Sequence, residues 1–183
     1  FEYCIFTNLT EDHLDFFGTM ERYGAAKRKL FEGERCICAV LNFDDETGRS
    51  LASVAAKSVS YALENPSDVF AVDIGEGFGG CRYIINLFDE LYEIRLNMTG
   101  RHNVYNSMAA AECAKLIGIP VSVIAEGLAS LEKVSGRLER AGAYRGADIF
   151  VDFAHTPDGL EKSLRALRPH CKGRLICLFG CGG

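Results

Sequence analysis

Lys27 is a charged residue placed where an amphipathic helix would carry an apolar one. With about 3.6 residues per turn, residues 19–31 predict a helix whose apolar stripe has Lys27 near its middle. The amine could reach solvent while its stem packs, which is the usual outcome, or it could pair with a carboxylate. Burial could instead lower its pKa and leave a neutral amine that reacts with carbon dioxide. The resulting carbamate would offer two oxygen atoms to Mg²⁺, and sequence physics alone favours this third interpretation least.

The loop before this helix carries further side chains able to do acid–base or metal chemistry. His13 lies in EDHLD, among the carboxylates of Glu11, Asp12 and Asp15. The loop follows YCIFTN, an apolar run that predicts a buried strand, and ligands of α/β sheets usually bind at the carboxyl ends of strands. A solvated, helix-capping loop explains the same residues. The closeness of His13 to Lys27 along the chain favours a shared site.

Two asparagines mark the start of a small-residue helix predicted over about residues 103–116. Asn103 and Asn106 lie about one helical turn apart in HNVYN. Asparagine is common at helix N-caps. Two amides on one helix edge could also match the donor and acceptor pattern of a purine, and the sequence leaves both interpretations open.

Residues in the last third of the chain suit a ribose or phosphate ligand. Asp152, His155 and Asp158 follow the predicted strand IFVDF, in a position that equally suits a helix N-cap. Arg137 lies in the polar stretch 132–148, predicted to link two domains, from which a guanidinium could reach a bound phosphate. The sequence contains no G-x-S-x-G motif, so no serine hydrolase triad is predicted.

The elements that must position these residues alternate between strands and helices, as is typical of an α/β protein. Strands are predicted in YCIFTN, RCICAVLNF, SVSYAL and VFAVDI, a strand pair in residues 81–98, and a short helix in SLASVAAK. A further helix is predicted over about residues 121–131. Towards the end, IFVDF, PDGLEKSLRALRPH and RLICLFG predict a βαβ unit with parallel strands.

The glycine-rich segment GEGFGG fits the G-x-G-x-x-G pattern of dinucleotide-binding proteins. That pattern binds pyrophosphate only where a helix begins directly after it. The residues that follow, CRYIINLF, are typical of a strand. The segment therefore predicts a glycine-rich hairpin or bulge and no dinucleotide site.

Composition excludes several classes of function. The 183 residues are 48% hydrophobic and 25% charged, which is ordinary for a globular protein. A net charge of −5 predicts no general affinity for nucleic acid or anionic membranes, and no apolar run reaches the length of a membrane span. Most of the eight cysteines lie in apolar runs without zinc-finger spacing, which favours a reduced, cytosolic protein over a disulfide scaffold or a metal or redox module. Both ends of the chain resemble cuts through a longer protein.

Four segments together resemble the Mur ligase family, in the right order and across the whole chain. They are TNLTEDHLDFFGTMERYGAAKRKLF, GRHNVYNSMAAA, GRLE and VDFAHTPDGLEKSLRALRPHCKGRLICLFGCGG. The resemblance implies an α/β fold in two parts. Residues 1–140 would be the second part of a mostly parallel-sheet, P-loop-type ATPase domain, and residues 141–183 the first βαβ unit of a Rossmann-like C-terminal ligase domain.

The resemblance also implies roles for the residues above. Lys27 would be the carbamylated lysine, with His13 close to the carbamate and to Mg²⁺. Asn103 and Asn106 would contact the adenine of ATP, and Arg137 would face its phosphates. Asp152 and His155 would meet the nucleotide. Two residues depart from the family pattern, Phe153 where tyrosine is usual and His102 where phenylalanine is commoner.

The activity that the resemblance implies is ATP-dependent amide-bond formation in peptidoglycan precursor synthesis. An amino acid, diaminopimelate or lysine, would be added to UDP-MurNAc-L-Ala-D-Glu through an acyl phosphate, by a cytosolic and monomeric enzyme. The family's P-loop would lie before Phe1 and its acceptor-selecting motif after Gly183, so the piece alone is expected to be inactive. Alternatives are a relative of cyanophycin or folylpolyglutamate synthetase type, or a non-catalytic nucleotide-binding protein.

Overall fold

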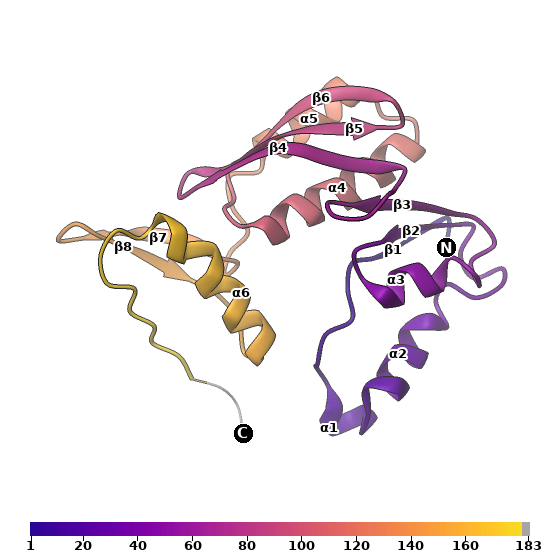
Figure 1. The fold of residues 1–183 in the computed structure, drawn as a ribbon, viewed down its shortest axis with the longest axis horizontal. Coiled ribbons are helices and arrows are strands. Elements are labelled where there is room, and N and C mark those ends of the chain that lie inside the picture. The colour runs from indigo at the N-terminus through magenta and orange to yellow at the C-terminus, as the bar shows by residue number, and fades with distance from the viewer. Residues whose placement is uncertain (181–183) are drawn as a thin grey trace.

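In residues 1–180, which the computed structural model describes, six strands form one sheet in chain order (Figure 1). The strands are β1 Tyr3–Phe6, β2 Cys38–Asn42, β3 Ser58–Ala62, β4 Val69–Gly77, β5 Gly80–Leu87 and β6 Glu90–Leu96. The first four pair in parallel, and β4 to β6 form an antiparallel meander. The predicted α/β class and mostly parallel sheet are confirmed. Cys181 and the two glycines after it, predicted as part of a glycine loop, lie outside the described residues.

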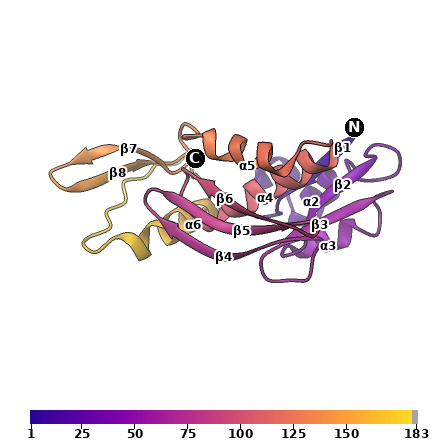
Figure 2. The same cartoon turned by 90° about the horizontal axis from the view of Figure 1, so that it is seen from above.

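Helices cover both faces of the sheet. They are α1 Leu14–Phe17, α2 Met20–Arg28, α3 Glu46–Leu51, α4 Arg101–Leu116 and α5 Val121–Ser130. Figure 2 shows α4 and α5 along one face of the strands. Strand β2 is buried throughout because Val40 packs into the core that includes α4, while Ala39 and Leu41 pack into a second core with Leu51 of α3. Its continuous apolar sequence is what a central parallel strand requires.

The last third of the chain forms a hairpin and a helix beside the sheet. Strands β7 Glu139–Tyr144 and β8 Ala147–Val151 pair with each other, and helix α6 Pro157–Leu167 leads into the 3₁₀ turn Arg168–His170. The tip of the β4–β5 hairpin reaches this part, since the Phe78 ring lies 5.4 Å from the Phe150 ring and 5.5 Å from the His170 ring. These aromatic contacts tie the two parts of the chain together.

Two local predictions are wrong. The polar stretch 132–148 is not simply a link, because β7 and the start of β8 lie within it and pair as an antiparallel hairpin. The short helix predicted in residues 50–57 is α3, which ends at Leu51. It begins earlier because the Asp45 carboxylate accepts hydrogen bonds from the backbone of Thr47 and Gly48 and so caps the helix at that point.

The βαβ unit predicted near the end is only partly formed. Strand β8 and helix α6 are present, but residues 174–180 belong to no strand. Ile176, Leu178 and Phe179 are exposed, and a cavity of about 850 Å³ lies between this segment, β8 and α6. A strand exists only where its backbone pairs with a neighbour, and β8 pairs here with β7. An apolar sequence indicates that a segment can form a strand, but it does not identify the strand with which the segment pairs.

The segment GEGFGG is a hairpin, as predicted. Its residues end β4 and begin β5, with a register shift between Val72 and Gly75. Gly80 has a φ of 128°, and a Cβ there would lie 1.8 Å from the Leu96 carbonyl oxygen, so only glycine fits. The glycines serve chain reversal and close strand packing.

The helices and the cysteine thiols of the described part of the chain are ordinary for a globular protein. None of the helices in the described part of the chain is both long and apolar enough to span a membrane. The seven cysteines that fall within residues 1–180 are free thiols, and burial raises the pKa of Cys4 and of Cys81 to about 11.

Candidate active site

Lys27 lies against the loop that follows β1. Its Nζ donates a 3.3 Å hydrogen bond to the backbone carbonyl of Asn8 and lies 4.8 Å from the centre of the Tyr23 ring. Thr19 caps the start of α2 by accepting from the Arg22 amide, which sets the helix register. Lys27 and Tyr23 are half-buried, and within Met20–Arg28 no residue is fully buried. The amine therefore faces the protein, as the apolar stripe predicts, but stays close to solvent.

His13 contacts the same aromatic ring. Its imidazole meets Tyr23 edge-on with ring centres 5.9 Å apart, and its Nε2 lies 3.5 Å from an Asp12 carboxylate oxygen. The backbone of His13 is in the left-handed region at a φ of 54°, held by a hydrogen bond from its amide to Asp12 Oδ1. His13 and Lys27 thus share Tyr23 as a common neighbour, so the structure brings the two predicted residues together.

The chemistry of this pair decides how it could bind a metal. Mg²⁺ prefers oxygen ligands, whereas unmodified Lys27 and His13 offer only nitrogen. Within residues 1–180 no group of three His, Cys, Asp or Glu side chains could hold a metal ion. The unmodified pair therefore does not fit Mg²⁺. Carbamylation of Lys27 would supply the missing oxygen donors, and Mg²⁺ commonly takes one or two carboxylates together with substrate phosphates and water.

The two asparagines of α4 have different surroundings. The N-cap of α4 is Gly100, so Asn103 lies in the first turn and is not the cap. Asn103 is buried and its Nδ2 donates a 2.8 Å hydrogen bond to the Thr99 carbonyl. Asn106, about one turn later, is exposed and available to a ligand. The two asparagines are spaced as predicted, but the side chain of Asn103 is hydrogen-bonded to the backbone just before the helix.

Arg137, Phe153 and His155 form a second cluster at the end of β8. The Arg137 guanidinium lies 5.6 Å from the centre of the Phe153 ring, and the His155 ring meets the same ring edge-on at 5.3 Å. A hydrogen bond from the Phe153 amide to the Gly136 carbonyl brings the two segments together. Arg137 and His155 are both exposed. His155 Nδ1 hydrogen-bonds to the Phe153 carbonyl at 2.9 Å, so the Arg137 guanidinium and His155 Nε2 are the groups available to a phosphate or ribose.

Asp152 holds this cluster in place. Its Oδ2 accepts a 2.6 Å hydrogen bond from the Leu138 amide, and its Oδ1 accepts from the Ala154 amide at 2.8 Å and from Ser163 Oγ at 3.1 Å. One carboxylate therefore joins the segment of Arg137, the end of β8 and helix α6. Thr156 caps α6 by accepting from the Gly159 amide. Asp152 is predicted as a ligand residue, and its contacts in the structure also make it an organiser of the cluster.

His102 lies where the start of α4 meets α6. A Cβ on Gly100 would lie 2.6 Å from the His102 ring and 3.2 Å from the Ala166 side chain, so the two helices approach closely there. Burial lowers the pKa of His102, while the negative charge of Asp152 acts in the opposite direction. The histidine that departs from the family pattern is thus at the contact between the α4 end of the sheet domain and the Asp152 cluster.

The predicted residues fall into separate groups. His13 and Lys27 meet at Tyr23, whereas Arg137 and His155 meet at Phe153, on elements that lie apart in Figure 1. Asp152 joins the second group through its hydrogen bonds to the Leu138 and Ala154 amides. The contacts of Tyr23 with both residues were not predicted from the sequence. The signal was available, because an aromatic residue four positions before a lysine lies beside it on a helix.

Comparison with known families follows this division of the chain. A family model described as the Mur ligase middle domain matches residues 1–114, and one described as the Mur ligase, glutamate ligase domain matches residues 136–183. The first contains His13, Lys27 and the two asparagines, and the second contains Arg137, Asp152 and His155. The two groups of site residues thus fall in the two matched domains.

Named relatives match along the whole chain. The chain is 41% identical over 189 residues to a UDP-N-acetylmuramoyl-L-alanyl-D-glutamate–2,6-diaminopimelate ligase from Xanthomonas campestris, and 42% identical over 187 residues to the ligase of that name from Pseudomonas aeruginosa. Each alignment covers 100% of this chain and 38% of the relative. The chain therefore spans well under half of the length of these relatives.

Solved structures of similar fold give the same result as the sequence comparisons. A diaminopimelate ligase of the same name superposes with a TM-score of 0.77 at 29% identity, over 100% of this chain and 38% of that one. A MurF ligase from Thermotoga maritima, solved in complex with ADP, superposes with a TM-score of 0.77 at 25% identity, over 91% of this chain and 39% of that one. Domain matches, sequence relatives and fold all indicate one assignment: the chain belongs to the Mur ligase family.

Proposed function

We propose that the protein containing this chain is an ATP-dependent ligase that adds diaminopimelate to UDP-MurNAc-L-Ala-D-Glu in peptidoglycan precursor synthesis. The observation that carries this proposal is the identity of about 41% to diaminopimelate ligases, maintained along the entire chain. This chain matches 38% of the length of that relative, so the activity is proposed for the whole protein that contains the chain. Lysine is the alternative amino acid.

The proposed reaction uses the two site groups in different ways. ATP would be held by Asn103 and Asn106 at its base and by Arg137, Asp152 and His155 around its ribose and phosphates. The exposed guanidinium of Arg137 suits a phosphate, because arginine offers several donors in a rigid fork. Transfer of the γ-phosphoryl group to the substrate carboxylate would give an acyl phosphate, which the amine of the amino acid then attacks with release of phosphate.

Lys27 and His13 would serve the metal. As a carbamate, Lys27 would offer oxygen atoms to Mg²⁺, which would neutralise charge during phosphoryl transfer. His13, whose side chain is 61% exposed, would be free to turn towards that metal. We place the division between the two domains just before Arg137, since the second family match begins at residue 136, a few residues earlier than the sequence predicts. We also propose a monomeric enzyme of the cytosol that acts on soluble UDP-linked substrates.

The test is a ligase assay on the full-length protein. Release of phosphate from ATP should require both UDP-MurNAc-L-Ala-D-Glu and diaminopimelate, and lysine should replace diaminopimelate poorly. Lys27→Ala should abolish turnover, and the intact protein should carry the mass of one added carbon dioxide on Lys27, lost on acidification. Turnover with a bare Lys27 amine would remove the carbamate role.

Two other assignments predict different results. A non-catalytic nucleotide-binding protein would bind ATP without turnover with any acceptor. A ligase of folylpolyglutamate or cyanophycin type would release phosphate with its own acceptors and not with the muramyl dipeptide. The folylpolyglutamate synthetase structure superposes at 19% identity, a level that supports the shared fold and no shared substrate.

A further inference from the structure

The loop of residues 7–9 is the direct support of the Lys27 amine. It follows β1, and its central residue, Asn8, offers the carbonyl that accepts the hydrogen bond from Lys27 Nζ. The next residue, Leu9, packs against α2, since a Cβ on Gly24 would lie 3.1 Å from Leu9 Cδ2. The position of this short loop therefore sets where the amine is held.

Asp45 fixes one end of the loop from a distant part of the chain. Its Oδ2 accepts a 2.9 Å hydrogen bond from the Leu9 amide, while its Oδ1 caps α3 by accepting from Thr47 at 2.8 Å and from Gly48 at 3.4 Å. The two oxygens thus have separate tasks, and only Oδ2 holds the loop.

Asn42 fixes the other end. At the end of β2, its Nδ2 donates a 2.7 Å hydrogen bond to the Thr7 carbonyl, and its Oδ1 accepts from the Asp44 amide at 2.9 Å. Asn42 is almost fully buried, so water does not compete strongly for these bonds. The donor and the acceptor of this one amide again have separate tasks, and only the donor holds the loop.

The fold keeps these two residues close to the loop. A Cβ on Gly48 would lie 1.9 Å from the Asn42 carbonyl oxygen and 3.3 Å from the Phe6 ring, so α3 begins in direct contact with the ends of β1 and β2. Any larger residue would move α3 outwards and take Asp45 with it. The loop is therefore held at Thr7 and Leu9, one residue on either side of Asn8.

We propose that Asn42 and Asp45 are positioning residues that hold residues 7–9 and, through the Asn8 carbonyl, the amine of Lys27. The inference deepens the proposed function, because it rests on Lys27 acting in the ligase reaction. Neither residue contacts the amine itself. Their effect is to keep the Lys27 tip in one place while it is modified and while it takes part in the reaction.

Two conservative variants separate positioning from folding. Asp45→Asn keeps an oxygen for the cap of α3, since Asn is an equally good N-cap, but presents an NH₂ group to the Leu9 amide. Asn42→Asp keeps the acceptor for the Asp44 amide but places an oxygen against the Thr7 carbonyl. Each variant keeps the acceptor of its local turn and removes the group that bonds to the loop. Asn42→Asp also places a carboxyl group in a buried position, so its melting temperature is measured alongside.

The experiment uses the full-length protein and two measurements. Amide hydrogen exchange of Leu9 should be about tenfold faster or more in both variants, because its acceptor is lost or its loop is released. In the ligase assay, kcat should fall about 10- to 100-fold while KM for ATP stays within about twofold, as expected when a reacting group is misplaced by about an ångström. The fraction of Lys27 that carries carbon dioxide should fall in parallel and recover with added bicarbonate.

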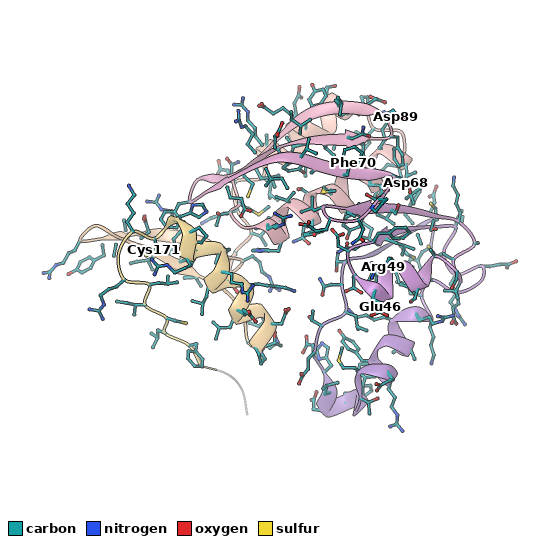
Figure 3. The ribbon with its side chains drawn as sticks, viewed as in Figure 1. Glu46, Arg49, Asp68, Phe70, Asp89 and Cys171 are labelled. Atoms are coloured by element: carbon teal, nitrogen blue, oxygen red, sulfur yellow. The ribbon has the colours of Figure 1, made fainter. Side chains whose placement is uncertain are left out.

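Asp68→Ala is the matched control. Asp68 accepts hydrogen bonds from the Ser60 amide and hydroxyl at 2.8 and 2.7 Å, in a turn that does not touch the loop. Figure 3 shows Asp68 at the start of β4 and Glu46 and Arg49 on α3, on separate elements. This variant should lower the melting temperature and leave kcat and Leu9 exchange unchanged.

The outcomes separate the two proposals. Unchanged Leu9 exchange and kcat in both conservative variants would overturn the positioning role while leaving ligase activity intact. An equal loss of kcat in Asp68→Ala at a matched melting temperature would also overturn it, since the effect would be general destabilisation. If the wild-type protein shows no ligase activity, the proposed function fails, and Leu9 exchange still decides whether Asn42 and Asp45 hold the loop.

Discussion

The amine of Lys27 lies 4.8 Å from the centre of the Tyr23 ring, one turn earlier on the same helix. The face of an aromatic ring attracts a cation such as the Lys27 amine. The imidazole of His13 meets the same Tyr23 ring edge-on. Tyr23 is therefore a common neighbour of the two residues proposed to serve the metal.

Replacement of Tyr23 tests this arrangement. Tyr23→Phe keeps the ring and should retain kcat within about twofold. Tyr23→Leu should lower kcat about tenfold, because the ring that packs beside the Lys27 side chain and against the His13 imidazole is lost. Steady-state kinetics of the full-length protein provide the measurement. Equal kcat for Leu and Phe at this position would mean that the ring has no part in placing either residue.

Arg137 is expected to act on ATP alone. Arg137→Ala should raise KM for ATP about tenfold or more, since it removes a charge-assisted donor from the phosphates. The control is Arg140→Ala, which removes an exposed arginine that pairs with Asp148 at 2.5 Å. A similar change of KM in the control would show that loss of positive charge, and not this position, is responsible.

Glu112 gives the fold an unusual dependence on pH. It is fully buried on α4, and within residues 1–180 neither carboxyl oxygen has a hydrogen-bond partner. Burial, with a smaller contribution from the charge of Asp68, raises the pKa of Glu112 to about 8, so the folded state keeps a proton that the unfolded state loses near pH 4.5. The free energy of unfolding should therefore fall as pH rises from about 4.5 to 8, by at most about 1.4 kcal/mol per pH unit.

Glu112→Gln removes this titration without changing the size of the side chain. Urea unfolding of the variant between pH 5 and 8 should show a flatter stability profile, with the variant gaining on the wild type as pH rises. The two proteins should be closest in stability at pH 5, where the wild-type carboxyl is neutral. Parallel profiles would mean that Glu112 keeps an ordinary pKa.

Gly48 and Gly127 should respond to alanine in opposite directions. At Gly48 the new Cβ would lie 1.9 Å from the Asn42 carbonyl oxygen, so Gly48→Ala should destabilise the protein by about 2 kcal/mol or more. Gly127 is in the middle of α5 with no atom within 4 Å of the new Cβ, so Gly127→Ala should stabilise it by about 0.5–1 kcal/mol. Thermal unfolding measures both. A stable Gly48→Ala variant would contradict the close contact between α3 and β2.

Much of the fold could be predicted because it depends on local sequence patterns. Apolar runs and turns predicted the strands β1 to β6 and the helices α2, α4 and α5, and the stripe on residues 19–31 predicted that Lys27 faces the protein. These features depend on the spacing of apolar residues within a single segment, so each segment can be interpreted by itself. The motifs in order were also enough to predict the Mur ligase family, which the domain matches confirm.

Other features required the tertiary structure. Asp45 and Leu9 are 36 positions apart, and Asn42 and Thr7 are 35 apart, so no local pattern joins them. The partner of β8 is the polar strand β7 and not the apolar segment 174–180, which the sequence predicts as a strand. A sequence determines which faces are apolar and which side chains could do chemistry. Which distant backbone groups meet depends on how all the elements pack together, because a hydrogen bond exists only when both partners arrive at the same place.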